Sequence, residues 1–118
     1  MYWFPFYWWS MPAILKGWID RVFTHGWAYL YSTEGGTTRL LTKMKVKVIG
    51  IGGAHRRTYE RHEYINAINK QIGEGIFEYC GGTFLGTELI IPINEQSQNA
   101  GLDRVFEIGC NLRFETRI

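Results

Sequence analysis

The sequence predicts an α/β domain built on a parallel β-sheet, and two observations carry that prediction. Segments with the patterns of strands and helices alternate along the chain, which is the order of a parallel α/β sheet. The segment "KVKVIGI" (45–51) begins by alternating and ends apolar on both faces, as expected of a strand buried in such a sheet. Because the chain has 118 residues, we expect 1–118 to form one domain.

The N-terminal third predicts the end of a strand, a helix and a loop. "MYWFP" has the pattern of the last residues of a strand. In "PAILKGWIDRVF" (12–23) the apolar residues recur at the spacing of one helix face, and Pro12 suits the first turn. Ser10 lies where a hydroxyl can cap that helix. Glycines and hydroxyl residues predict a long loop over 26–38, and loops of that length are usually functional.

The remaining elements follow from the same patterns. After the strand at 45–51 we expect a loop with the sequence "GGAHRRTYER", then a helix over about 62–80 that Gly81 and Gly82 terminate. "TELIIPI" (87–93) predicts a second apolar strand, which Pro92 closes. An amphipathic helix is expected over about 98–116.

Composition excludes several classes of function. A formal net charge of +2 gives no electrostatic case for a nucleic-acid or membrane-surface partner. The aromatic N-terminal run is interrupted by Pro5 and Ser10, so it predicts no membrane span, and it has no basic region or cleavage site typical of a secretory signal. Cys80 and Cys110 have no metal-type spacing. We therefore expect two buried thiols, no metal site and a cytoplasmic location.

Two segments are expected to meet where the strands end. In open α/β sheets, ligands bind outside the carboxyl ends of the strands, where "PFYWWS" (5–10) and "GIGGAHRRTY" (50–59) fall. The first offers flat rings for stacking and the second offers glycine amides. Together they suit a tricyclic cofactor such as flavin. A dinucleotide fingerprint fails, because His55 stands at the position of its third glycine.

The combination is more specific than either segment alone. "FPFYWWSMPAILKGWIDRVFTHGWAYLY", followed by a strand ending in a glycine pair and then a tyrosine, resembles the NAD(P)H dehydrogenase (quinone) family of flavoproteins. The resemblance covers nearly the whole chain and is dense over 3–31. It implies a flavodoxin-like fold, an open parallel sheet with helices on both faces. It also implies two-electron hydride transfer from NAD(P)H through FMN or FAD to a quinone, with ping-pong kinetics.

The resemblance also implies roles for individual residues. The family's loop that packs on the flavin ring is matched by Pro5, Phe6, Trp8 and Trp9. The glycine pair beside the pyrimidine end of the ring is matched by Gly52 and Gly53. Tyr29 and Tyr31 match tyrosines of the substrate pocket that are reached across a dimer interface, so a homodimer is expected. Tyr59 falls near the tyrosine that stabilises charge on the flavin. Its candidate catalytic partner is His62, which lies only three positions later, whereas the family's histidine lies further on.

Several alternatives stay open at this stage. Trp8 and Trp9 could be core residues instead of cofactor contacts. His55, Arg56 and Arg57 could bind the extra phosphate of NADPH or form a solvated loop.

The resemblance is to the C-terminal two-thirds of the family. The first strand and helix, which hold the flavin phosphate, have no counterpart here, so we expect an N-terminally truncated domain of about three strands and three helices. The sequence does not decide whether the flavin is FMN or FAD, whether the donor is NADH or NADPH, or which acceptor is used. Azo and nitro aromatics would suit a flat pocket as quinones do. Two other functions are weighed. One is a regulator of a potassium-efflux system, and the other is a non-catalytic aromatic platform for sugars or a membrane interface.

Overall fold

The computed structural model describes residues 1–115, and its centre is a three-stranded parallel sheet. The strands are β1 (Tyr2–Pro5), β4 (Lys45–Ile51) and β5 (Thr83–Ile90), in the spatial order β1-β4-β5. The middle strand β4 has the bounds that its pattern predicts. Val46, Val48 and Ile49 on β4 are almost fully buried, as both faces of a central parallel strand should be. The predicted α/β class is confirmed.

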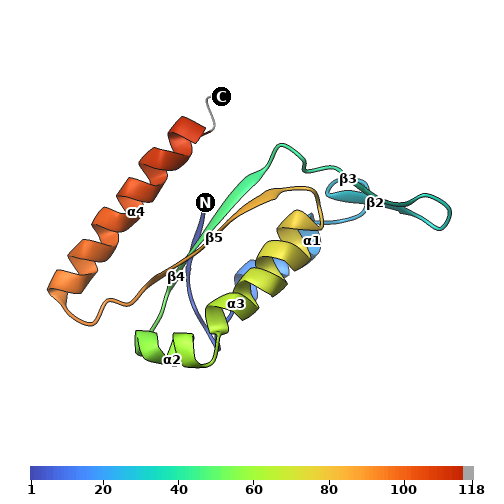
Figure 1. Cartoon of the computed structure of the whole chain (residues 1–118). Helices are drawn as coiled ribbons and strands as arrows, with labels where there is room; N and C mark the ends of the chain where they lie inside the picture. Colours follow the sequence, from blue (N-terminus) through green and yellow to red (C-terminus); the bar gives the residue numbers. More distant parts are fainter. Residues whose placement is uncertain (116–118) are drawn as a thin grey trace.

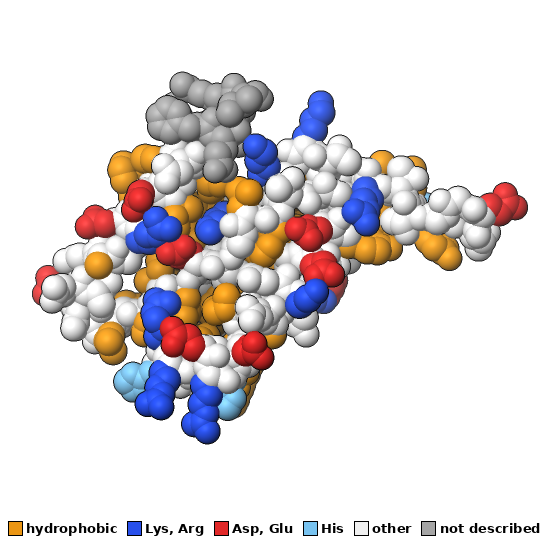
Figure 2. All heavy atoms as spheres, in the orientation of Figure 1, with side chains coloured by type: hydrophobic (Ala, Val, Ile, Leu, Met, Phe, Trp, Pro, Cys, Tyr) orange, Lys and Arg blue, Asp and Glu red, His pale blue; other side chains and the backbone are white. Residues whose placement is uncertain are grey.

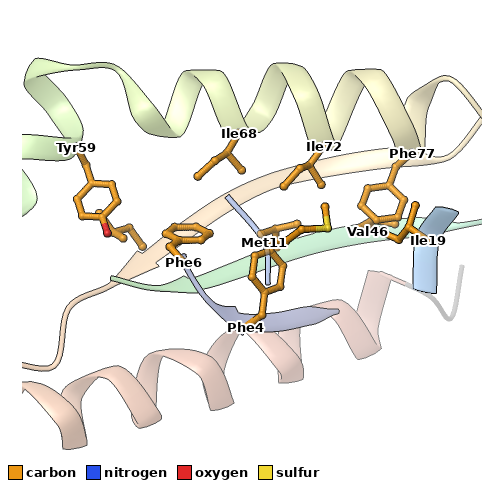
Figure 3. Packing of buried hydrophobic residues seen from close by; sticks show 11 residues of the cluster. Phe4, Phe6, Met11, Ile19, Val46, Tyr59, Ile68, Ile72 and Phe77 are labelled. Carbon is orange, nitrogen blue, oxygen red and sulfur yellow. The ribbon is translucent and has the colours of Figure 1, made fainter. Parts of the chain in front are cut away.

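Helices cover both faces of this sheet (Figure 1). On one face lie α1 (Ala13–Val22), α3 (Tyr64–Ile68) and the π-helix η1 (Asn69–Glu78) that continues it. The main core lies between them and the sheet (Figure 3); its members include Phe4, Phe6, Met11, Ile19, Val46, Val48, Ile68, Ile72 and Phe77. Helix α4 (Glu95–Glu115) covers the other face through a smaller core of Ile49, Val105 and Ile108.

The predicted loop over 26–38 is wrong, because this region contains a β-hairpin. Strand β2 (Tyr29–Ser32) pairs antiparallel with β3 (Gly36–Arg39), and the pair projects from the body of the molecule (Figure 1). In the turn, Ser32 Oγ accepts the Gly35 N–H at 2.8 Å, and Gly36 has a φ of +71°. Most residues of both strands are exposed, so they lack the apolar alternation by which a half-buried strand is recognised.

The helix expected over 62–80 begins at Tyr64 and continues through α3 and η1 to Glu78, and part of the loop before it is helical. Helix α2 (Arg56–Arg61) occupies residues predicted as loop, and Tyr59 anchors it with a buried ring. Glu63, at a φ of +55°, separates α2 from α3. Buried positions in the second helix follow at steps of four and five residues (68, 72, 77), which suits the wider turn of a π-helix. The predicted glycine stop is confirmed, since Gly81 has a φ of +97°.

The last strand and helix begin earlier than predicted. Strand β5 begins at Thr83 instead of 87 and ends before Pro92; Gly86, at a φ of +92°, lies at an irregularity in its pairing with β4. Helix α4 begins at Glu95 instead of 98, because Asn94 Oδ1 accepts the Ser97 N–H at 2.8 Å and so caps the first turn. The predicted end at 116 lies outside the described residues.

Two smaller predictions are wrong. Ser10 does not cap α1: the helix starts after Pro12 without a side-chain cap, and Ser10 pairs with Tyr7 instead. Cys80 is buried as expected, but Cys110 is exposed on α4. Within residues 1–115, no helix combines the length and the apolarity needed to cross a membrane.

Candidate cofactor site

The segments that leave β1 and β4 lie side by side at the carboxyl edge of the sheet, as the sequence predicts. Parallel pairing places Pro5 opposite Ile51. The Phe6 N–H continues this pairing and donates to the Ile51 carbonyl at 2.9 Å. The aromatic segment 6–10 and the glycine loop 52–54 therefore start from neighbouring points.

Trp8 and Trp9 form a tight turn with an uncommon backbone. Tyr7 and Ser10 exchange two backbone hydrogen bonds of 3.0 and 3.1 Å across it. Between them, Trp8 has a φ of +49° and Trp9 a φ of +63°. A left-handed backbone costs an L-residue with a side chain about 1–2 kcal/mol, and such strain concentrates at functional sites. The Trp8 side chain is 91% exposed.

Trp9 turns inward while Trp8 turns outward. The Trp9 ring stacks on Tyr64 with centroids 4.1 Å apart and planes 10° apart. Its contact with Tyr59 is edge-to-face at 5.4 Å. The sequence left open whether Trp8 and Trp9 are core residues or cofactor contacts. In the structure Trp9 is partly packed, whereas Trp8 is exposed on the surface. Tyr64, which clamps the turn, was missed by the sequence analysis; its spacing of four residues from Ile68 was the signal for it.

Phe6 belongs to the core. Its side chain is 8% exposed, and it packs against Phe4 and Tyr59 at ring distances of 5.7 and 6.2 Å (Figure 3). A Cβ atom on Gly50 would lie 1.7 Å from the Phe6 ring, so the ring fills the space above that glycine. The structure thus places Phe6 beneath the site and Trp8 on its surface, although both were predicted to contact the cofactor.

Tyr59 fills the concave side of the glycine loop. Its side chain is 2% exposed, and a Cβ atom on Gly52 would lie 2.5 Å from its hydroxyl oxygen. Burial raises the pKa of Tyr59, while hydrogen bonds from the Ala54 and Gly53 amides act to lower it. Tyr59 therefore keeps its proton at neutral pH.

The Gly52 amide of this loop already has a backbone partner. The Gly52 N–H donates to the Ile90 carbonyl at 2.8 Å, and the Gly53 and Ala54 amides act on the Tyr59 hydroxyl by lowering its pKa. No heavy atom lies within 4 Å of a Cβ placed on Gly53, so the loop's surface is open there.

His62 lies close to the site without contacting Tyr59. Its ring stacks on Tyr64 at 5.3 Å, and no hydrogen bond or ring contact joins it to Tyr59 in the part of the chain that the structure describes. His62 follows the end of α2, whereas Tyr59 points from α2 into the core. The pairing of these two residues is a hypothesis that this arrangement does not favour.

Comparison with known proteins assigns the family. Residues 1–107 match the model of a family described as having a flavodoxin-like fold. The chain belongs to this family. NAD(P)H dehydrogenase [quinone] 1 of Rattus norvegicus is 35% identical over 115 residues, which are 96% of this chain and 41% of that protein. The family-level resemblance found in the sequence is therefore confirmed.

Two further similarities are informative. The glutathione-regulated potassium-efflux system ancillary protein KefF of Salmonella arizonae is 33% identical over 81 residues, covering 69% of this chain and 44% of that protein. The solved structure of an NAD(P)H:quinone oxidoreductase from Methanothermobacter marburgensis superimposes with a TM-score of 0.77 at 26% identity, covering 92% of this chain and 55% of that one. The chain spans less than half the length of these two curated relatives.

In this flavodoxin-like chain, Tyr29 and Tyr31 lie far from the carboxyl edge. They belong to the hairpin, which precedes β4, whereas the glycine loop follows β4 (Figure 1). The seven residues of β4 span about 23 Å at about 3.3 Å each. Tyr29 packs edge-to-face on Tyr79 at 5.7 Å, and Tyr31 is 59% exposed. The structure does not bring these tyrosines together with Trp8 or Gly53 of the same chain.

Proposed function

We propose that this chain carries the ring-binding part of a flavin-dependent NAD(P)H:quinone oxidoreductase. The observation that carries the proposal is the exposed Trp8 indole beside the open Gly53 loop at the carboxyl edge of the sheet. An indole presented on a turn that is clamped from below suits a flat ring system. The named activities of similar proteins support the same reading.

Four residues or pairs have distinct roles in this proposal. Trp8 and Pro5 would hold the flavin ring, Gly53 would let it approach the backbone closely, and Tyr64 would keep Trp9 in place below it. A bound FMN or FAD would supply the hydride chemistry, accepting a hydride from NAD(P)H and passing two electrons to a quinone. Tyr59, protonated and packed against Gly52, would carry a proton at the floor of the site.

The experiment is a visible absorption titration of the 118-residue protein with FMN and then with FAD. We expect a protein-perturbed flavin band that NAD(P)H bleaches and a quinone restores. Trp8→Ala should weaken flavin binding about tenfold or more, in line with one aromatic stacking contact. Trp27→Ala is the control, because Trp27 is 49% exposed and lies elsewhere, against Phe23. A folded protein that perturbs neither flavin would refute the proposal.

We also propose that a second copy of the chain completes the substrate pocket. The separation of Tyr29 and Tyr31 from Trp8 in one chain is what a pocket formed between two copies requires. Sedimentation should then show a dimer, and Tyr31→Ala should raise the KM for a quinone without changing flavin affinity. A monomer with full quinone turnover would contradict this part. A cytoplasmic location stays a prediction.

A regulatory role is the second candidate, because the sequence similarity to KefF supports it. In that case the same fold would bind and tune a membrane potassium-efflux protein. Co-purification with such a protein would support this role. Rapid quinone turnover without any complex would count against it.

A further inference from the structure

Positively charged and imidazole side chains gather on one side of α2. His55, Arg57, Thr58, Arg61 and His62 line a surface hollow of about 490 Å³, and no carboxylate contributes to its lining. Figure 2 shows Lys or Arg side chains flanked by histidines along the lower edge of the molecule, where Figure 1 places α2.

The acidic residues of this segment lie on another side. Glu60 and Glu63 line a separate hollow of about 300 Å³ together with Arg56. Arg56 is also engaged, because its Nη2 donates to the Leu89 carbonyl at 3.0 Å. Short as it is, α2 thus presents Arg57 and Arg61 to one hollow and Glu60 to another.

Arg57 and Arg61 lack an ion-pair partner among the side chains that the structure describes. Neither forms an ion pair with any residue among 1–112. Four residues apart on one helix, their like charges disfavour the helix by about 0.2–0.5 kcal/mol. Two guanidinium groups that repel each other beside a hollow are placed to take up an external anion.

The cluster adjoins the aromatic turn of the proposed cofactor site. His55 directly follows the glycine loop, and the stacked rings of His62, Tyr64 and Trp9 link the hollow to the turn. A nicotinamide dinucleotide with its ring near Trp8 would carry its phosphates and its second nucleoside away from that position. The hollow on α2 lies next to the same edge of the sheet.

We propose that this cluster binds the phosphate monoester on the adenosine ribose of NADPH and so selects NADPH over NADH; this inference rests on the proposed function. A phosphate monoester carries about −1.5 to −2 charge at pH 7 and offers three acceptor oxygens. Planar guanidinium groups match that geometry in a bidentate manner. NADH has only a hydroxyl at this position, which leaves both arginines unpaired.

The test measures binding of 2′,5′-ADP and of 5′-AMP to the 118-residue protein by calorimetry, without flavin. These nucleotides differ by the monoester in question and carry no nicotinamide. We expect 2′,5′-ADP to bind at least about tenfold more tightly than 5′-AMP, and Arg57→Gln and Arg61→Gln each to remove most of that difference. Arg57→Lys, which keeps the charge without the planar fork, should restore only part of it. Arg21→Gln is the control, because Arg21 is exposed on α1 and forms no ion pair within residues 1–112.

Three outcomes would overturn the inference. These are equal binding of the two nucleotides, an unchanged preference in both glutamine variants with native circular dichroism, and displacement of 2′,5′-ADP by an equal concentration of inorganic phosphate. The last outcome would identify a site for free anions instead of a nucleotide. Preferential binding of 2′,5′-ADP by a protein that takes up no flavin would refute the proposed function alone. Normal flavin chemistry with equal use of NADH and NADPH would refute this inference alone.

Discussion

Replacing Phe6 by alanine should lower the free energy of unfolding by about 3–5 kcal/mol. The ring is almost completely buried against Phe4, Tyr59 and Gly50. Losing about 100–120 Å² of buried apolar area accounts for about 2.5–3 kcal/mol at about 25 cal/mol per Å². The two lost ring contacts and the remaining cavity account for the rest.

The matched substitution is Trp8→Ala, which removes a larger ring two positions later. Because that side chain is 91% exposed, the free energy of unfolding should change by no more than about 0.5 kcal/mol. Urea denaturation followed by circular dichroism measures the free energy of unfolding of both variants. Flavin titration of the folded variants measures their flavin affinity. Trp8→Ala should lose flavin affinity while it keeps its stability.

The milder exchange Phe6→Leu keeps this comparison usable if Phe6→Ala does not fold. It should cost less than about 1.5 kcal/mol and leave flavin affinity unchanged. The reasoning would be refuted if Phe6→Leu kept full stability but lost flavin, or if Trp8→Ala unfolded the protein. Either result would mean that the two rings have exchanged roles.

Three further predictions follow from individual contacts. Gly50→Ala should destabilise the protein by about 1–3 kcal/mol or more in urea denaturation, because the new Cβ would meet the Phe6 ring. Gly53→Ala should have little effect on stability, because the space around Gly53 is open. Equal effects of the two substitutions would contradict this packing. Trp8→Gly should relieve the strain of the left-handed backbone and raise the free energy of unfolding by up to about 1 kcal/mol. A decrease of about 1 kcal/mol in the free energy of unfolding would show instead that the turn is not strained. The Arg104 guanidinium, at 2.8 Å, lowers the pKa of Glu88. The native state therefore favours the charged carboxylate, and this stabilisation is present above the unfolded-state pKa of about 4.3 and lost as the pH falls through the lower native value. The stability difference between the wild type and Glu88→Gln should thus shrink below about pH 4, and a difference that stays constant down to pH 2 would exclude the pair as its source.

Local patterns were sufficient for the regular elements that bury a face. Strand β4 and helix α1 lie within a residue of their predicted bounds, because β4 is buried on both faces and α1 packs one apolar stripe on the core. The hairpin β2–β3 and helix α2 were missed for the opposite reason. The hairpin is exposed on most sides and α2 buries only Tyr59, so neither leaves a repeating apolar signal.

The meeting of the aromatic turn and the glycine loop was also predictable from the chain alone, since parallel strands end at one edge of a sheet. The motif over 3–31 indicated the family. The directions of the rings at that edge were not predictable. Phe6, Trp8 and Trp9 are close in sequence and alike in chemistry, yet one lies in the core, one in solvent and one against Tyr64. Positive φ angles at the turn and contact with Tyr64, more than fifty residues away, decide those directions, and no pattern within residues 6–9 encodes either. The same holds for Arg57 and Arg61, which form no ion pair among residues 1–112, because only the folded α2 places them at one hollow and Glu60 at another.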